Sequence, residues 1–159
     1  MRSTSTHRTL PELLDAALER ISRLQPAEAL AATDAGALMI DIRSEVDRDC
    51  DGIVPGSLHI PRTVLEWRLA PDSAWRSPYV GDLDQHVVLI CDHGCSSILA
   101  AATLADLGFA RASDVIGGYA AWRESGLPCV PTRSTRRDRK ALAGMRGPDQ
   151  VARRAGAAS

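Results

Sequence analysis

The residues of this 159-residue chain that are best suited to chemistry lie in the segment CDHGCSS, residues 91–97. Cys91 directly follows the apolar run HVVLI, and Ser96 and Ser97 open an alanine- and leucine-rich stretch. A tight turn from a strand into a helix points successive backbone N–H groups toward its centre, and Gly94 permits the positive φ that such a turn requires. The positive end of the helix favours a thiolate. The segment therefore predicts an anion-stabilised, nucleophilic cysteine at position 91.

The elements around this segment follow an alternating pattern. The expected strands cover residues 37–42, 57–61, 86–90 and 113–116, and the expected helices cover residues 12–24, 26–36, 64–69, 97–107 and 119–124. Strands that alternate with helices imply right-handed crossovers and an α/β fold, with an open, mostly parallel sheet and helices on both faces. In such sheets ligands bind beyond the carboxyl ends of the strands, which is where Cys91 falls.

The chain divides into three expected parts. Thr9 and Glu12 have capping-box spacing, so residues 1–23 are expected to form an N-terminal leader helix, whose apolar stripe suits either docking on the domain or a dimer contact. Residues 24–131 are expected to form the domain. Residues 132–159 carry eight Arg and Lys against two Asp, and this basic tail is expected to be disordered.

Composition excludes several classes of protein. The four cysteines are too few for a disulfide scaffold and show no metal-ligand spacing, so we expect a reducing, cytoplasmic location and no metal. Acidic residues interrupt the N-terminal apolar pattern, which argues against a signal peptide or a membrane span. The tail is short and lacks interleaved aromatics, so a solvated tail is favoured over a nucleic-acid-binding one.

Four segments in order resemble one known family. They are ALMIDIR, GIVPGSLHIP, CDHGCSS and VIGGYAAWRESGLP, and together they span about residues 24–131. This combination is similar to the single-domain, rhodanese-like sulfurtransferases of the rhodanese superfamily. The resemblance implies that Cys91 takes the outer sulfur of a donor, such as thiosulfate or another persulfide source, as a persulfide. Cys91 would then pass that sulfur to a thiophilic acceptor, such as cyanide or another thiol, without any cofactor.

The resemblance also implies roles for the residues around Cys91. The loop residues would bind the donor and stabilise the persulfide: Asp92, His93, Gly94, Cys95, Ser96 and Ser97. Asp41 and Arg43 would support them. The chain departs from the family in having Ile53 where a histidine is common, and in having no Arg or Lys in the loop to attract anionic donors. The physiological donor therefore stays open.

Several residues have two interpretations. Cys95 either resolves the persulfide as a disulfide with Cys91 or fills space as an inert side chain, and the second is favoured. His93 either binds a donor anion or is an exposed loop residue with no role. For Asp41 and Arg43, an ion pair that holds neighbouring loops is favoured over a cation presented to the site.

Positions outside the loop are interpreted structurally. Gly117 and Gly118 are expected to supply backbone freedom for packing, with Trp122 as a core anchor and Trp67 as a cover of the core. Cys50 and Cys129 are expected to be spectators.

Two other functions compete with sulfur transfer. Related phosphatases bind a phosphoryl group with Cys-x5-Arg, but Ser97 occupies the place of that arginine. The other alternative is a weakly catalytic or non-catalytic rhodanese-like module that senses sulfide or redox state or binds a partner, and Cys91 is compatible with a sensor.

Overall fold

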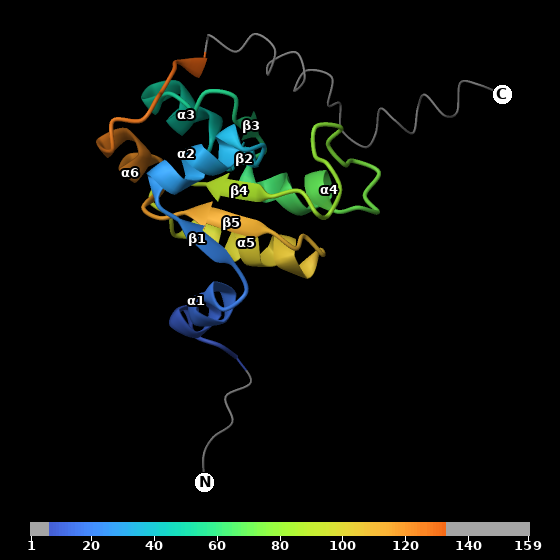
Figure 1. Ribbon diagram of the computed structural model, residues 1–159. Helices are drawn as coiled ribbons and strands as arrows, with labels where there is room; N and C mark the ends of the chain where they lie inside the picture. The colour runs from blue at the N-terminus through green and yellow to red at the C-terminus, as the bar shows by residue number, and fades with distance from the viewer. Residues whose placement is uncertain (1–6, 133–159) are drawn as a thin grey trace, which may run out of the picture.

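Five strands form a single parallel sheet in the computed structural model, which describes residues 7–132 (Figure 1). The strands are β1 (Ser22–Leu24), β2 (Leu38–Asp41), β3 (Leu58–His59), β4 (Val87–Ile90) and β5 (Ala112–Val115). Their order across the sheet is β1-β5-β4-β2-β3, and every neighbouring pair is parallel. All the strands therefore end at the same edge, and the loops that follow them meet there.

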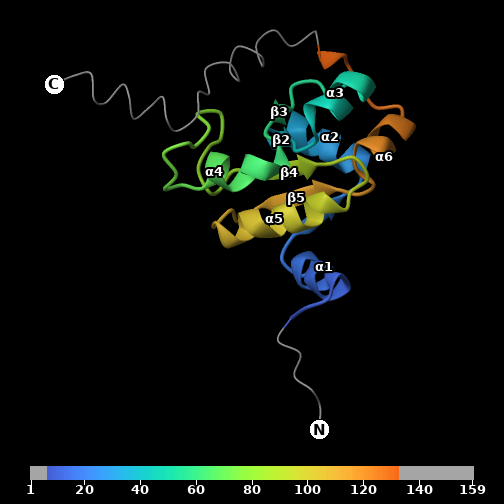
Figure 2. The ribbon, with the colours of Figure 1, turned by 180° about the vertical axis from the view of Figure 1, so that it is seen from behind.

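Helices cover both faces of the sheet, as the two opposite views show (Figures 1 and 2). They are α1 (Leu10–Leu18), α2 (Pro26–Asp34), α3 (Glu45–Asp51), α4 (Leu65–Leu69), α5 (Ser96–Asp106) and α6 (Gly118–Glu124), and the 3-10 turn η1 (Arg62–Val64) precedes α4. α2 and α6 pack on one face, whereas α4 and α5 pack on the other. The predicted α/β class with a parallel sheet is confirmed.

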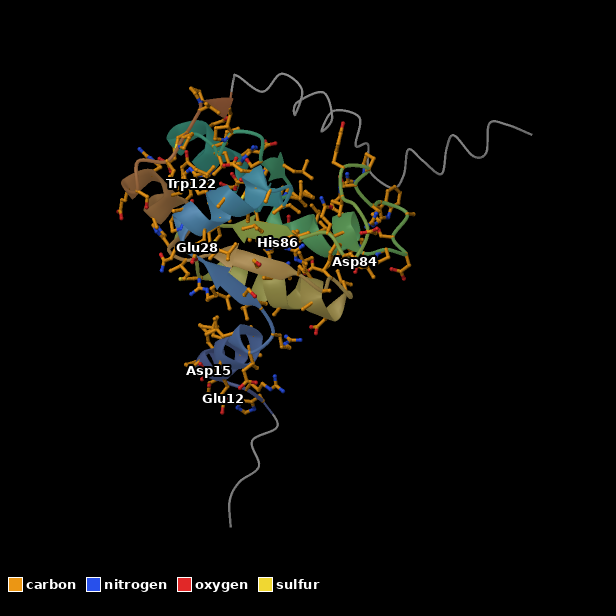
Figure 3. All side chains as sticks on the ribbon, viewed as in Figure 1. Glu12, Asp15, Glu28, Asp84, His86 and Trp122 are labelled. Carbon is orange, nitrogen blue, oxygen red and sulfur yellow. The ribbon has the colours of Figure 1, made fainter. Side chains whose placement is uncertain are left out.

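Each face of the sheet has its own apolar core. The larger core joins the sheet to α4 and α5 and includes Ile40, Leu65, Leu69, Leu89, Ala101 and Leu104. The smaller core joins the sheet to α2 and α6 and includes Ala29, Met39, Val88, Val115, Tyr119 and Trp122. Trp122, labelled on α6 in Figure 3, has no exposed surface, and its indole N–H donates to the Pro128 carbonyl at 2.9 Å. The prediction that Trp122 anchors the core is therefore confirmed.

The leader helix docks on its own domain. Ala17 of α1 is buried in a small cluster with Ile98 and Ala102 of α5. The predicted capping box is present, because the Thr9 N–H donates to Glu12 at 2.7 Å and the Glu12 N–H donates to the Thr9 hydroxyl at 3.4 Å. α1 therefore forms an outer layer over α5, below the sheet in Figure 1.

Two elements differ from the expectations. Residues 22–24 were expected to end the first helix, but they form β1, which pairs with β5. The apolar spacing of Ile21 and Leu24 fits a helix, and the pairing that makes these residues a strand is with a segment about 90 residues away. The second difference is α3, where no element was expected because the segment has no apolar stripe that would indicate a helix. Ser44 caps this helix by accepting a hydrogen bond from the Asp47 N–H at 3.1 Å.

The remaining expected elements begin and end within a few residues of the observed ones. Ile53 is fully buried and forms an antiparallel bridge with Val130. The expectation that Trp67 covers the core is wrong, because Trp67 is 58% exposed. No helix among residues 7–132 is long and apolar enough to cross a bilayer. Residues 133–159 of the basic tail lie outside the described residues, and the three-part division of the chain stays a prediction.

Candidate active site

The loop from Cys91 to Ser96 joins the end of β4 to the start of α5, and its centre is the Cys91 sulfur. The Gly94 N–H donates to Cys91 Sγ at 3.1 Å, and the thiol donates to the Ser97 hydroxyl at 3.2 Å. Gly94 has a φ of +75°, the left-handed conformation that lets its N–H turn inward. Cys91 is only 5% exposed, so these groups act on the sulfur in a site largely shielded from water.

The start of α6 packs directly against the loop and holds it in place. The Tyr119 N–H donates to the Cys91 carbonyl at 2.8 Å, and the Ala120 N–H donates to the Asp92 carbonyl at 3.0 Å. A Cβ on Gly118 would lie 2.5 Å from the Cys91 oxygen and 2.6 Å from the Gly94 nitrogen. Gly118 is therefore required for the close approach of two backbones as well as for its positive φ.

The surroundings of Cys91 favour its ionised form. Burial acts to raise the pKa of the thiol, but the hydroxyls of Ser97 and Ser96 and the backbone N–H groups of Ser97 and Gly94 oppose it. The net effect lowers the pKa of Cys91 below its ordinary value. The loop thus supplies a nucleophilic thiolate at neutral pH more readily than a free cysteine would.

A partly buried ion pair that no sequence motif predicts lies behind the loop, with the Arg23 side chain 27% exposed and that of Asp114 fully buried. Arg23 of β1 and Asp114 of β5 are register partners, and the Arg23 guanidinium donates to both carboxylate oxygens at 2.8 and 2.9 Å. Arg23 also donates to the Gly94 carbonyl at 2.8 Å, and the Ser97 hydroxyl donates to Asp114 at 2.8 Å. No local motif contains these contacts, which form only because β1 lies beside β5.

The other predicted loop residues lie toward the surface. His93, Cys95 and Ser96 are exposed, and Cys95 Sγ lies 4.0 Å from the His93 carbonyl. Asp92 is partly buried, and burial, followed by the nearby charge of Asp47, raises the pKa of its carboxyl group. The structure brings Cys91, Gly94, Ser96 and Ser97 together and leaves His93 and Cys95 at the rim.

Asp41 and Arg43 belong to a buried cluster at the end of β2. The Asp41 carboxylate accepts from Arg43 at 2.7 and 3.0 Å and from Arg48 at 3.2 Å. Arg43 also donates to the Gly52 carbonyl at 2.9 Å and lies 3.7 Å from the centre of the Tyr119 ring. The side chains of Asp41 and Arg43 have no exposed surface. This geometry favours the interpretation that the pair holds β2, α3 and α6 together.

We expect Asp41→Asn to lower the free energy of unfolding by about 3 kcal/mol, because it leaves two buried guanidinium groups without their carboxylate. The matched control is Asp51→Asn, which removes an ion pair with Arg123 that is about half exposed on both sides and should cost less than about 1 kcal/mol. Urea denaturation measures both changes. Equal losses in the two variants would contradict the structural role of the buried cluster.

Within the described part of the chain, no three His, Cys, Asp or Glu side chains gather in a way that could hold a metal ion. The Cys91 loop itself supplies a sulfur nucleophile, N–H and hydroxyl donors, and the positive end of α5.

Comparisons with known proteins agree with this geometry. Residues 25–125 match the rhodanese-like domain. The thiosulfate sulfurtransferase GlpE of Stutzerimonas stutzeri is 33% identical over 103 residues, which cover 65% of this chain and 85% of GlpE. A solved protein of unknown function from Rhodopseudomonas palustris, called a possible tyrosine phosphatase, is 34% identical, with a TM-score of 0.72 over 82% of this chain and 99% of that one.

A second solved structure, the polysulfide-sulfur transferase homodimer of Wolinella succinogenes, is 26% identical, with a TM-score of 0.60 over 79% of this chain and 89% of that one. The matched region includes β2 to β5 and the whole of the Cys91 loop. The chain therefore belongs to the rhodanese family.

Proposed function

We propose that the protein is a sulfurtransferase of the thiosulfate sulfurtransferase type, in which Cys91 carries the transferred sulfur as a persulfide. One observation carries the proposal: the buried Cys91 sulfur receives the Gly94 N–H at 3.1 Å, at the mouth of the 11-residue helix α5. The names of the relatives GlpE and polysulfide-sulfur transferase support the same reaction class.

In the first half of the reaction, the Cys91 thiolate attacks the outer sulfur of the donor. With thiosulfate, a new sulfur–sulfur bond forms to Cys91, the sulfur–sulfur bond of thiosulfate breaks, and sulfite leaves with the bonding electron pair. The outer sulfur of the resulting persulfide is anionic. Loop N–H groups, with the hydroxyls of Ser96 and Ser97, would stabilise that charge.

In the second half, a thiophilic acceptor takes the outer sulfur. A cyanide ion or a thiolate attacks that sulfur, the persulfide bond breaks, and the Cys91 thiolate leaves with the electron pair. The donors that lower the pKa of Cys91 are the N–H groups of Gly94 and Ser97 and the hydroxyls of Ser96 and Ser97, which together form a cradle around the sulfur. These donors also make Cys91 a better leaving group, so the cradle serves both halves of the reaction.

Intact-mass analysis tests the proposal. The protein is incubated separately with thiosulfate, mercaptopyruvate and a cysteine persulfide, and we expect one added sulfur, located on Cys91 by peptide fragmentation. Cyanide should then remove this sulfur as thiocyanate. No added sulfur with any of these donors would overturn the proposed function, and a stable persulfide that no acceptor discharges would favour the sensor.

Phosphoryl transfer is not supported by the site, although one similar structure is called a possible tyrosine phosphatase. Ser97 stands where the phosphatase arginine would be, and its hydroxyl contacts the buried Asp114 carboxylate at 2.8 Å. The site therefore lacks the bidentate guanidinium with which such phosphatases bind a phosphoryl group. We expect no hydrolysis of p-nitrophenyl phosphate.

We further propose that the partners are a small-molecule or protein sulfur donor and a thiol or cyanide acceptor, and that the protein is cytoplasmic. All four cysteines are free, which is compatible with a reducing compartment. The roles of Cys95 and His93 stay predictions, as does the expectation that the tail does not bind nucleic acid.

A further inference from the structure

The ion pair of Arg23 and Asp114 is connected to the Cys91 sulfur by hydrogen bonds through Ser97. Asp114 is fully buried, and its carboxylate accepts two N–H groups of Arg23, at 2.8 and 2.9 Å, and the Ser97 hydroxyl at 2.8 Å. Two parallel donors from one guanidinium are the geometry of an ionised carboxylate. An ionised carboxylate can only accept hydrogen bonds.

Ser97 therefore has one hydroxyl proton and two neighbours that compete for it. Its oxygen lies 2.8 Å from Asp114 Oδ2 and 3.2 Å from Cys91 Sγ. Because Asp114 cannot donate, the Ser97 proton points to Asp114, and a lone pair of Ser97 faces the sulfur. In this arrangement Ser97 accepts from the thiol and stabilises S–H. The Ser97 hydroxyl stabilises the thiolate, and so contributes to the lowered pKa of Cys91, only once its own proton has turned to the sulfur.

We propose that Asp114, held by Arg23, is a positioning residue that controls the protonation of Cys91 through the Ser97 hydroxyl. Asp114 keeps the Ser97 proton away from the sulfur in the resting enzyme. When the thiolate forms, the S–H bond breaks, the proton goes to water, and the Ser97 O–H turns from Asp114 to the sulfur. This inference rests on the proposed function, in which the Cys91 thiolate is the nucleophile.

Arg23 contacts both Asp114 and the loop that surrounds the Cys91 sulfur. One guanidinium nitrogen donates both to Asp114 at 2.9 Å and to the Gly94 carbonyl at 2.8 Å, and the N–H of Gly94 reaches the sulfur. The hydrogen bonds to Asp114 raise the pKa of Arg23, so the cation persists at every working pH. Arg23 thus holds a cation against the Asp114 carboxylate, which accepts the Ser97 hydroxyl proton.

Asp114 differs from the other charged groups near the sulfur. Among the described residues, those groups are Arg23, which acts on Cys91, and Asp92 and His93 of the loop itself. Asp41 at the end of β2, Arg43 just after it and Asp47 of α3 act on Asp92. Asp114 Oδ2 lies within about 6 Å of Cys91 Sγ, because both contact the same Ser97 oxygen, and this is a range at which a like charge shifts a pKa. Asp114 also has a hydrogen-bonded path to the sulfur through the Ser97 side chain.

The experiment follows alkylation of Cys91 by iodoacetamide as a function of pH, with the modified cysteine located by peptide fragmentation. In Asp114→Asn the amide can donate to Ser97, which frees the Ser97 proton for the sulfur. We expect the midpoint of the profile to fall by about one pH unit, so that alkylation below the wild-type midpoint is about tenfold faster. Asp106→Asn, an exposed position about 13 Å along α5 from Ser97, should leave the midpoint unchanged.

A second comparison separates the hydrogen-bonded path from the charge alone. In the Ser97→Ala background, Asp114→Asn should change the alkylation rate less than about threefold. An unshifted midpoint in folded Asp114→Asn, or an equal shift with and without Ser97, would overturn the inference. Asp114→Ser, also uncharged, carries the same expectation if the asparagine variant does not fold. Alkylation needs no sulfur donor, so failure of persulfide formation would overturn only the proposed function.

Discussion

Cys91→Ser is expected to lower the rate of sulfur transfer by at least about 10³-fold. A serine hydroxyl is not ionised at neutral pH, and its oxygen cannot form the persulfide through which the sulfur passes. The cradle should survive, because serine can occupy the site and accept the Gly94 N–H that now reaches the sulfur at 3.1 Å. The measurement is thiocyanate formed from thiosulfate and cyanide, with thermal unfolding to verify the fold.

Cys50→Ser provides the matched control, because Cys50 is an exposed cysteine of α3 outside the loop. It should retain the wild-type rate. A Cys91→Ser variant that keeps a tenth of the activity would mean that another group carries the sulfur, and the proposed mechanism would then be wrong.

Gly118→Ala is expected to lower the free energy of unfolding by about 4 kcal/mol and to abolish activity. The new methyl group would lie 2.5 Å from the Cys91 oxygen, 2.6 Å from the Gly94 nitrogen and 2.7 Å from the Asp92 carbonyl carbon. All three are backbone atoms of the loop, so none can move without moving the cradle. The φ of +62° adds the strain of a left-handed alanine. Urea denaturation and the thiocyanate assay measure the two effects.

Gly126→Ala separates steric clash from backbone strain. Gly126 has a similar φ of +70°, but a Cβ at that position meets nothing within 4 Å. We expect a loss of about 1 kcal/mol and unchanged activity. If the two variants lost the same stability, the strain of a positive φ alone would explain Gly118, and the close approach of α6 to the loop would not matter.

The glycine pair at the start of α6 is only partly predictable from the sequence. Gly117 and Gly118 of the motif VIGGYAAW have positive φ values of +73° and +62°. Their expected role was backbone freedom for packing. The sequence could not reveal that a second segment, residues 91–94, lies against Gly118 at distances that exclude a side chain.

The ion-pair partners of Arg48 and Arg23 could not be predicted from the local sequence either. Arg48 stands in a strongly charged stretch that predicts an exposed surface, yet its side chain is only 7% exposed because it contacts Asp41. An arginine next to acidic residues in sequence gives no indication of which carboxylate it will meet after folding. The same is true of Arg23, whose partner Asp114 is 91 residues away.

Local sequence by itself determined the α/β class, most of the elements and the identity of the Cys91 loop. These features depend on hydrophobic periodicity, on caps and on a seven-residue turn whose donors all come from within it, so neighbouring residues suffice to specify them. Only the tertiary structure decided that residues 22–24 form an edge strand beside β5, and that Arg23 and Asp114 thereby lie behind Ser97. Strand order and register are set by packing between distant segments, and no local pattern encodes them.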